Sequence, residues 1–322
     1  MKIVFHGANA ANFRNSFDHL VEAVHAIVDV SDGLDLPAER QHYETADVII
    51  GIRLGAAEPT PKGVRLFHAP AAGTDAVDRS RLPAGAVLCN CFGHEDAIAE
   101  YVMTALLLRH VPIPRANERL RQGHWDFWAG RPGALRTELG TQTIGLLGYG
   151  HIGKAVGARA KAFGMRVLVA NRTPIPAGSL IDESFALDQL PAFMGRCNVV
   201  VVSLPLTETT RSIVGASELA SMRRDGVVVN VGRGPVIDEQ ALFDALQSGR
   251  IGGAIVDTWY TYPSPDALAV HPSRLPFHEL SNIVMTPHMS GWTAGTVRRR
   301  QLTMADNINR LARGEPLANV LA

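Results

Sequence analysis

Short apolar runs separated by turn residues dominate the N-terminal third of the chain. Each is bounded by Gly, Pro or polar residues, and in order they read KIVFHG, AIVDV, DVIIGI, VRLFHA and AVLCN. Continuous apolar runs that alternate with helical patterns are typical of buried strands in a parallel sheet. The pattern therefore predicts a parallel-sheet α/β domain at the start of the chain.

A second series of apolar runs follows the helical pattern EDAIAEYVMTALLLRH at residues 95–110. Its members are TIGLLG, RVLVAN, NVVVVSL, GVVVNVG, GGAIVD and NIVMTPH, which predict a second doubly wound parallel sheet. The last helical pattern, SGWTAGTVRRRQLTMADNINRLARGE, is expected to return to the first domain. We therefore predict a discontinuous first domain, residues 1–95 and 288–322, with a second domain, residues 96–287, inserted into it.

Charge and cysteine content narrow the function classes. Lys+Arg and Asp+Glu both number 31, so neither nucleic acid nor an anionic membrane is the expected partner. We expect the basic run VRRR, residues 297–300, to be a solvated helix face. Cys89 and Cys91 lie on one face of an apolar run and are interpreted as buried thiols, with no metal site expected. Neither a leader nor an apolar span is recognisable in the sequence, and a cytoplasmic protein is expected.

The motif GLLGYGHIGKAVG carries a GxGxxG pattern made by Gly148, Gly150 and Gly153, with His151 and Ile152 between the last two. It follows an apolar run, opens a helical pattern and precedes another apolar run, which is the context of dinucleotide binding. The glycines permit a tight turn, close approach to a pyrophosphate and close helix-to-strand packing. The pyrophosphate would lie at the helix N-terminus, where N–H groups and the helix dipole favour an anion.

The end of the following strand indicates which cofactor is used. An NAD site has an Asp or Glu there for the ribose 2′-OH, whereas an Arg suits the 2′-phosphate of NADP. This chain has Asn171, Arg172 and Thr173 instead of a carboxylate. We expect NADP (NADPH) to be preferred, with NAD possible. The alternative is that Arg172 is merely exposed or stacks on adenine in a cofactor-tolerant site.

Two further strand ends carry candidate catalytic groups. Arg233 lies between glycines in NVGRGPVID, and His288 follows Pro287 in MTPHMSG. Ligands of open α/β sheets bind at the carboxyl ends of the strands. An Arg there can bind a substrate carboxylate and polarise a carbonyl, and a His can exchange a proton between an alcohol and a ketone.

Taken together, these motifs resemble the D-isomer-specific 2-hydroxyacid dehydrogenases along nearly the whole chain. The resemblance rests on GLLGYGHIGKAVGARAKAFGMRV, SLPLTETTRSIV, NVGRGPVIDEQALFDALQSGRIGGAIVD and MTPHMSG, in that order. It implies a Rossmann NAD(P)-binding domain inserted into a discontinuous flavodoxin-like substrate domain. It also implies an interdomain cleft and, usually, a homodimer.

The resemblance implies roles for individual residues. Arg233 would bind the carboxylate and carbonyl of a 2-oxo acid, and His288 would donate the proton in reduction. Asp257 resembles the acid near the nicotinamide carboxamide, and the backbone N–H groups of Ala72 and Gly73 would face the substrate carboxylate. Further expected contacts are His94 and Trp292 for the substrate, and Pro205, Thr207 and Val231 for the cofactor. The segment ANERLRQGHW resembles the one that crosses to the partner subunit.

The chain departs from the family at DTWYTYP. Most members have a Glu five residues after the acid, where it supports the catalytic His, but here that position is Tyr262. A carboxylate stabilises imidazolium by its charge, whereas a phenol forms only a neutral hydrogen bond. We predict a lower pKa for His288 than in relatives that have the Glu, and hence a reduction rate that falls off at a lower pH.

Several functions remain open at this point. The leading hypothesis is an NADPH-dependent reductase of small 2-oxo acids of the glyoxylate or hydroxypyruvate type. Formate dehydrogenases of the same superfamily locally resemble DTWYTYPSP and PHMSG, so a formate- or phosphite-type dehydrogenase is an alternative, although His94 stands near where they use Asn. A catalytically weak NAD(P)-sensing protein is the third. His68, His94, Trp259, Trp292 and Tyr262 could line the pocket or simply pack.

Overall fold

The computed structural model describes residues 1–322 except 134, 177, 265–266 and 322, and divides into two compact units. The first comprises Met1–His94 and Trp292–Ala322, and the second comprises Glu95–Gly291. Both are α/β units with parallel sheets, as the apolar runs predict. That the first unit binds substrate and the second binds a dinucleotide stays a prediction.

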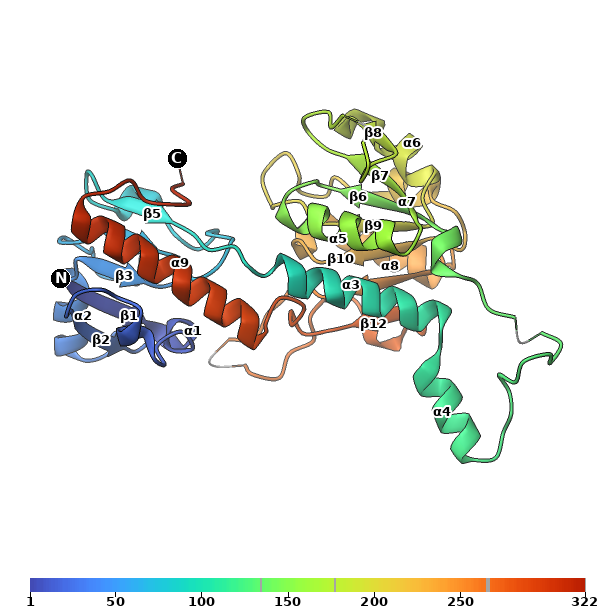
Figure 1. The fold of residues 1–322 in the computed structure, drawn as a ribbon, viewed down its shortest axis with the longest axis horizontal. Helices are drawn as coiled ribbons and strands as arrows, with labels where there is room; N and C mark the ends of the chain where they lie inside the picture. The colour runs from blue at the N-terminus through green and yellow to red at the C-terminus, as the bar shows by residue number, and fades with distance from the viewer. Residues whose placement is uncertain (134, 177, 265–266, 322) are drawn as a thin grey trace. The chain divides into compact units, whose positions relative to one another are not determined.

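The first unit contains a five-stranded parallel sheet in the order β2-β1-β3-β4-β5 (Figure 1). This is the flavodoxin-like order, and the strands coincide with the five predicted runs. The strands are β1 (Lys2–His6), β2 (Ala26–Val30), β3 (Val48–Ile50), β4 (Leu66–His68) and β5 (Val87–Cys89). The helices are α1 (Gly7–Ala11), α2 (Pro37–Glu44) and α9 (Ala294–Arg313), with 3-10 turns at Phe17–His19 and Arg79–Arg81.

Helix α9 makes the first unit discontinuous, as predicted. Thr293 caps its N-terminus by accepting a hydrogen bond from the Thr296 N–H, and Gly314 ends it in the left-handed region. The apolar stripe that includes Met304 and Ile308 is fully buried against the core of the five-stranded sheet. The helix therefore covers one face of that sheet although more than 200 residues of chain separate them.

The expectation that VRRR is a solvated face is wrong for Arg300. Its neighbours Arg298 and Arg299 are exposed, but Arg300 is only 8% exposed. Its guanidinium donates from Nη1 to the Pro70 carbonyl at 3.0 Å and from Nε to the Phe92 carbonyl at 3.4 Å. The charged side chain thus satisfies carbonyls of the buried Pro70 and the half-buried Phe92, which a count of charges along the sequence cannot reveal.

The second unit contains a seven-stranded parallel sheet in the order β12-β11-β10-β9-β6-β7-β8. With β6 as the first strand, this is the Rossmann order extended by one strand. The strands are β6 (Thr143–Leu147), β7 (Arg166–Ala170), β8 (Glu183–Phe185), β9 (Val199–Val202), β10 (Val227–Asn230), β11 (Gly253–Val256) and β12 (Ile283–Met285). Strand β8 was not predicted, because its three half-buried residues form no apolar run.

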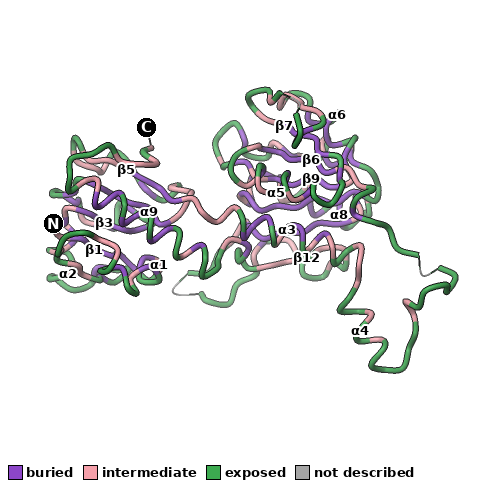
Figure 2. Tube along the Cα trace, viewed as in Figure 1, coloured by how far each residue is buried: buried purple, intermediate pink, exposed green. Residues whose placement is uncertain are grey.

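Helices cover both faces of this sheet, and apolar clusters fill the space between them. Figure 2 shows the strands as the buried layer and the segment around α4 as largely exposed. The helices are α3 (Glu95–His110), α4 (Ile113–Arg121), α5 (His151–Ala162), α6 (Leu190–Gly195), α7 (Ala216–Ser221) and α8 (Glu239–Gln247). Short 3-10 turns lie at Leu139–Thr141, Leu187–Gln189, Gly234–Val236 and Phe277–Glu279. The predicted helix at 95–110 is confirmed as α3.

The burial of Cys89 and Cys91 agrees with the prediction from the sequence. Cys89, Cys91 and Cys197 are buried free thiols, and burial raises the pKa of Cys89 to about 11. In the described part of the chain, no helix has the length and apolar character that crossing a membrane requires.

Replacing Arg300 by Met tests its structural role. The variant keeps the length of the side chain but loses the charged hydrogen bonds to Pro70 and Phe92, so the free energy of unfolding should fall by about 2 kcal/mol. The matched change Arg298→Met, on the exposed side of the same helix, should stay within about 0.5 kcal/mol of the wild type. Urea unfolding followed by circular dichroism measures both, and equal losses would contradict the assignment.

Candidate functional site

The glycine-rich turn after β6 has the geometry of an anion cradle. Gly148 has φ +97°, which favours glycine, and a Cβ on Gly153 would lie 2.3 Å from the Gly148 carbonyl oxygen. A Cβ on Gly150 would meet no atom within 4 Å, so the backbone is open to a ligand there. Gly150 is the N-cap of α5, whose first turn, His151 and Ile152 onwards, carries N–H groups without intrahelical acceptors. The residues present therefore fit a dinucleotide pyrophosphate.

The end of β7 presents a cation and a hydroxyl beside this turn. Asn171 accepts a hydrogen bond from the Tyr149 N–H at 3.3 Å and donates to the Thr173 carbonyl at 3.0 Å. Its amide thus ties the strand end to the glycine-rich turn. Arg172 and Thr173 are exposed, and these three positions hold no carboxylate. The preference for NADP expected from these residues stays a prediction.

The residues that follow β9 and β10 form the next part of the candidate site. Thr210 donates from its hydroxyl to the Pro205 carbonyl at 2.6 Å and accepts from the Thr207 N–H at 2.8 Å, which fixes that turn. Val231 is buried and donates its N–H to the Val202 carbonyl at 3.2 Å. The predicted contact positions Pro205 and Thr207 are exposed. Their role in binding a cofactor stays a prediction.

Two glycines hold Arg233 close to neighbouring backbone. A Cβ on Gly232 would lie 2.8 Å from the Leu204 carbonyl oxygen, and one on Gly234 would lie 2.3 Å from that of Trp259. Asn230, buried at the end of β10, accepts from the Gly232 N–H and donates to the Arg233 carbonyl. Sequence reasoning missed Asn230, and the only signal was a polar residue ending a run of valines. The half-buried Arg233 is thus mounted on rigid backbone.

A fully buried carboxylate, Asp257, anchors the segment that carries His288. Its Oδ1 accepts from the Thr286 hydroxyl at 2.5 Å and the Met289 N–H at 2.9 Å, and its Oδ2 accepts from the Ser290 N–H at 2.9 Å. Between these donors, His288 adopts φ +55°, which is uncommon outside glycine. Both Asp257 oxygens are therefore engaged by the chain itself, and contact with a nicotinamide stays a prediction.

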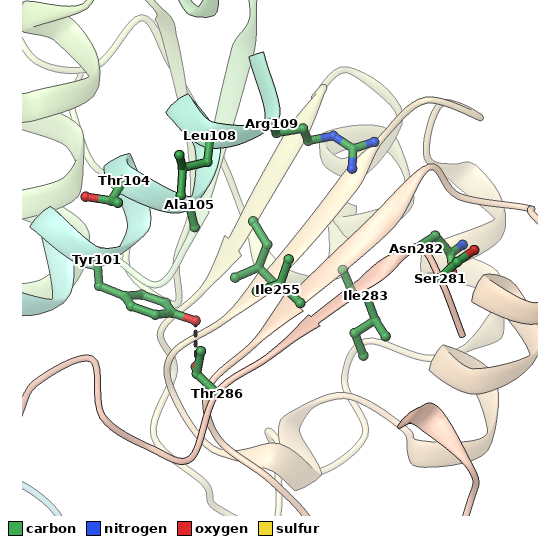
Figure 3. Close-up of a pocket in the computed structure, with 12 residues that line it drawn as sticks. Tyr101, Thr104, Ala105, Leu108, Arg109, Ile255, Ser281, Asn282, Ile283 and Thr286 are labelled. Atoms are coloured by element: carbon green, nitrogen blue, oxygen red, sulfur yellow. Dashed lines mark hydrogen bonds between the residues drawn. The ribbon is translucent and has the colours of Figure 1, made fainter. Parts of the chain in front are cut away.

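A hydrogen bond from α3 completes this network. Because Thr286 donates its proton to Asp257, the Tyr101 hydroxyl is the donor in its 2.7 Å contact with the Thr286 oxygen (Figure 3). The bond borders a hollow of about 400 Å³ between α3 and strands β11 and β12. Arg233, Tyr262 and His288 are not among the described residues that line this hollow, so it is separate from the catalytic candidates.

The hydroxyl of Tyr262 reaches the imidazole of His288. The distance from Oη to Nδ1 is 3.0 Å, and Oη also accepts from the Trp259 N–H at 3.1 Å. Protein atoms crowd the partly exposed His288 ring, and this desolvation lowers its pKa, as does the charge of Arg233, while Asp257 raises it. Burial raises the pKa of Tyr262. The position where the family resemblance implies a carboxylate thus supplies a neutral hydroxyl at hydrogen-bond distance.

The predicted substrate contacts lie in the first unit. Ala72 and Gly73 are half-buried in the loop after β4, where the Asn90 amide donates to the Ala72 carbonyl at 2.7 Å. His94 is the last residue of that unit's first segment. Trp292 is 46% exposed and packs edge-on against Phe13. Their roles stay predictions.

Five residues could, from the sequence, either line the pocket or simply pack. Two of them, His68 and Trp259, are core residues. His68 is fully buried and bonded to the Asn307 amide at 2.9 Å, and burial lowers its pKa to about 4, so it is neutral. Trp259 is 4% exposed, and its indole N–H donates to the Thr286 carbonyl at 2.8 Å. Among the described residues there is no group of three or more His, Cys, Asp or Glu that could hold a metal.

Known proteins match this chain in sequence and in fold. A family model described as "D-isomer specific 2-hydroxyacid dehydrogenase, NAD binding domain" matches residues 103–290. D-3-phosphoglycerate dehydrogenase of Methanocaldococcus jannaschii is 30% identical over 305 residues, which are 91% of this chain and 55% of that protein, so the chain spans about half of its length. The chloroplastic/mitochondrial formate dehydrogenase of Arabidopsis thaliana is 30% identical over 301 residues, 90% of this chain and 75% of that protein.

A solved structure shows the same fold over the whole chain. NADPH-dependent glyoxylate/hydroxypyruvate reductase from Sinorhizobium meliloti, in complex with NADP and sulfate, aligns with a TM-score of 0.78 at 22% identity. The alignment covers 99% of this chain and 98% of that one. At this identity the likeness establishes the arrangement of the elements, and the chemistry has to be argued from the residues.

Proposed function

The chain belongs to the D-isomer-specific 2-hydroxyacid dehydrogenase family, and from that premise we propose that it reduces small 2-oxo acids, such as glyoxylate or hydroxypyruvate, with a preference for NADPH. The observation that carries the proposal is the pairing of His288 with the Tyr262 hydroxyl at 3.0 Å, with Arg233 near enough to lower the pKa of that imidazole. An acid-base group beside a fixed cation suits a substrate that has both a carboxylate and a reducible carbonyl.

In the proposed reaction, different residues bind the substrate, polarise its carbonyl and transfer the proton. When bound, the nicotinamide supplies the hydride for the oxo carbon. Arg233 binds the carboxylate and polarises the carbonyl, while His288 gives a proton to the carbonyl oxygen. That Ala72, Gly73, His94 and Trp292 of the first unit contact the substrate stays a prediction. Asp257 keeps His288 in place through the backbone of the next two residues.

The preference for NADPH rests on the end of β7. Arg172 and Thr173 are exposed there, and Asn171 occupies the position where an NAD site would have a carboxylate. An arginine forms charge-assisted hydrogen bonds to a phosphate, whereas a ribose diol offers it no anion. Gly150, where the backbone is open, would hold the pyrophosphate.

Two other functions make different predictions from the same site. A formate- or phosphite-type dehydrogenase needs no proton from His288, and the similarity to a formate dehydrogenase over 90% of the chain supports this alternative. A weak NAD(P)-sensing protein would bind the cofactor without efficient turnover. The Arg233 and His288 pair favours the reductase over a formate dehydrogenase, which transfers no proton, and over a sensor, which needs no acid-base group. Phosphite oxidation also uses a cation and a base, so the assay below has to separate it from 2-oxo acid reduction.

Steady-state oxidation of NADPH with glyoxylate, hydroxypyruvate and phenylpyruvate tests the proposed reaction. We expect turnover with at least one of them, and Arg233→Gln should lower kcat/KM by about 10²- to 10³-fold, because the donor to the developing oxyanion is lost. The exposed Arg224→Gln, matched in chemistry, should leave kcat/KM unchanged. Oxidation of formate or phosphite without reduction of any 2-oxo acid would favour the first alternative, and cofactor binding without turnover the second.

Replacing Arg172 by Ala tests the cofactor preference. Loss of the charge-assisted contact with the 2′-phosphate should raise KM for NADPH by about 10- to 100-fold. KM for NADH serves as the internal control and should change by less than about twofold, since NADH has no phosphate at that position. Equal effects on both cofactors would indicate that Arg172 stacks on adenine.

The segment that contains α4, residues 113–133 and 135, supports the proposal of a homodimer. None of the α4 residues is buried, and the chain extends away from the rest of its unit here (Figure 1). It exposes large apolar side chains: Ile113 (63%), Leu120 (50%), Trp125 (63%), Trp128 (62%) and Leu135 (97%). So much apolar surface in one segment is typical of an interface. We propose that a second copy of the chain covers it.

Light scattering coupled to size-exclusion chromatography tests the dimer. Trp125→Ala should weaken self-association by about 30-fold or more, because aromatic anchors dominate interface energies. Leu180→Ala, which removes an exposed apolar side chain outside the segment, should not change it. A wild-type chain that is monomeric at micromolar concentrations would refute the proposal.

A further inference from the structure

The hydroxyl of Tyr262 lies between one donor and one acceptor. A phenol carries a single proton and accepts through its oxygen lone pairs. The Trp259 N–H already points at Oη, at 3.1 Å, so this contact uses a lone pair and leaves the proton of Tyr262 to be donated elsewhere. Within the described residues, the other hydrogen bond of this hydroxyl is the 3.0 Å contact with Nδ1 of His288.

We propose that Tyr262 donates its proton to Nδ1 and thereby fixes neutral His288 in the tautomer that carries its hydrogen on Nε2. In a neutral imidazole one nitrogen is a donor and the other an acceptor, so the partner of one nitrogen decides what the other presents. The catalytic meaning of this tautomer rests on the proposed 2-oxo acid reduction, but the tautomer itself does not.

A carboxylate at position 262 would fix the opposite tautomer. Ionised Glu can only accept, so it would hold a hydrogen on Nδ1 and leave a lone pair on Nε2 of the neutral ring. That form accepts a proton from an alcohol but cannot donate one to a carbonyl. With Tyr262, the neutral ring remains a donor from Nε2. Reduction therefore still has a proton donor when His288 is uncharged.

The groups that face His288 determine when it is uncharged. Arg233, after β10, lowers its pKa, Asp257, after β11, raises it, and Tyr262 brings no charge. Desolvation is the largest influence and lowers the pKa further. Because the neutral ring predominates above the pKa, a lowered pKa extends the pH range in which the tautomer of His288 matters.

The neutral ring transfers a proton in a balanced sequence. As the carbonyl oxygen gains negative charge, its new O–H bond forms with the hydrogen of Nε2, while the hydrogen of Tyr262 moves to Nδ1 and leaves a phenolate. The phenolate then takes the hydrogen back from Nδ1, while water protonates Nε2 and leaves as hydroxide. In the net reaction, water transfers one proton to the product and one hydroxide is released. A neutral imidazole whose surroundings lower its pKa can also polarise a carbonyl as a donor.

Two species of His288 therefore support reduction at different pH. The imidazolium acts at low pH, and its contribution falls as pH rises through the lowered pKa. The neutral tautomer maintained by Tyr262 then sustains a lower but constant rate. The expected pH profile of kcat/KM thus falls to a plateau instead of to zero.

Nitrogen NMR on protein labelled with ¹⁵N-histidine tests the tautomer without any turnover. His288→Gln identifies the two signals of that ring. Above the pKa of His288 we expect the chemical shift of an unprotonated nitrogen at Nδ1 and of a protonated one at Nε2. In Tyr262→Glu we expect the opposite pattern, with the shift of a protonated nitrogen at Nδ1 and of an unprotonated one at Nε2. In Tyr262→Phe both shifts should approach the average of these two values. A protonated Nδ1 in the wild-type protein would overturn the proposal, whether or not any variant folds.

The pH dependence of reduction provides the second readout. Tyr262→Phe should keep the low-pH limb and lower the plateau by about 10²-fold, since the proton relay to Nδ1 is lost. Tyr262→Glu should move the fall to higher pH, because the added charge stabilises imidazolium. A plateau unchanged in Tyr262→Phe would refute the relay. If no 2-oxo acid is reduced, the proposed function fails, while the NMR result still decides the tautomer.

Discussion

The buried carboxylate of Asp257 is the interaction on which the rest of the site depends. Burying an ionised group is costly unless donors surround it, and here the Thr286 hydroxyl and two backbone N–H groups do so. To deliver these donors, the chain after β12 has to turn back towards the end of β11. His288 lies within that turn and takes its positive φ as a consequence. The position of His288 is therefore set by the carboxylate of Asp257, which binds the residues on either side of His288 and does not contact its ring directly.

Close backbone packing gives the neighbouring strand ends the same rigidity. Gly232 and Gly234 leave no room for a Cβ, so the loop of Arg233 is pressed against the backbones of Leu204 and Trp259. Trp259 in turn donates its indole N–H to the Thr286 carbonyl. The ends of β9 to β12 are thus joined by backbone contacts and hydrogen bonds, which hold the segments of Arg233 and His288. A site held in this way can keep its geometry to the small tolerances that catalysis requires.

Much of this could be predicted from the sequence because apolar runs determine parallel strands. The two sheets, the helix at 95–110 and the returning helix α9 all follow from long patterns of burial. Strand β8 could not be found, because three half-buried residues at a sheet edge leave no such pattern. Arg300 and Asn230 were missed for another reason. Their importance comes from carbonyl and N–H groups that are distant in sequence or fixed by a turn, and residue type alone does not encode them.

Tyr262 shows how a motif departure gains meaning only in three dimensions. From the sequence it reads as a lost carboxylate, and hence as weaker support for imidazolium. The structure adds the Trp259 N–H, which occupies a lone pair of the phenol and so directs its proton. Trp259 is itself fixed by burial and by edge-on packing against Phe277. A carboxylate at position 262 would act on His288 through its charge, which salt and pH weaken. Tyr262 acts instead through a directional hydrogen bond, whose geometry the apolar core maintains.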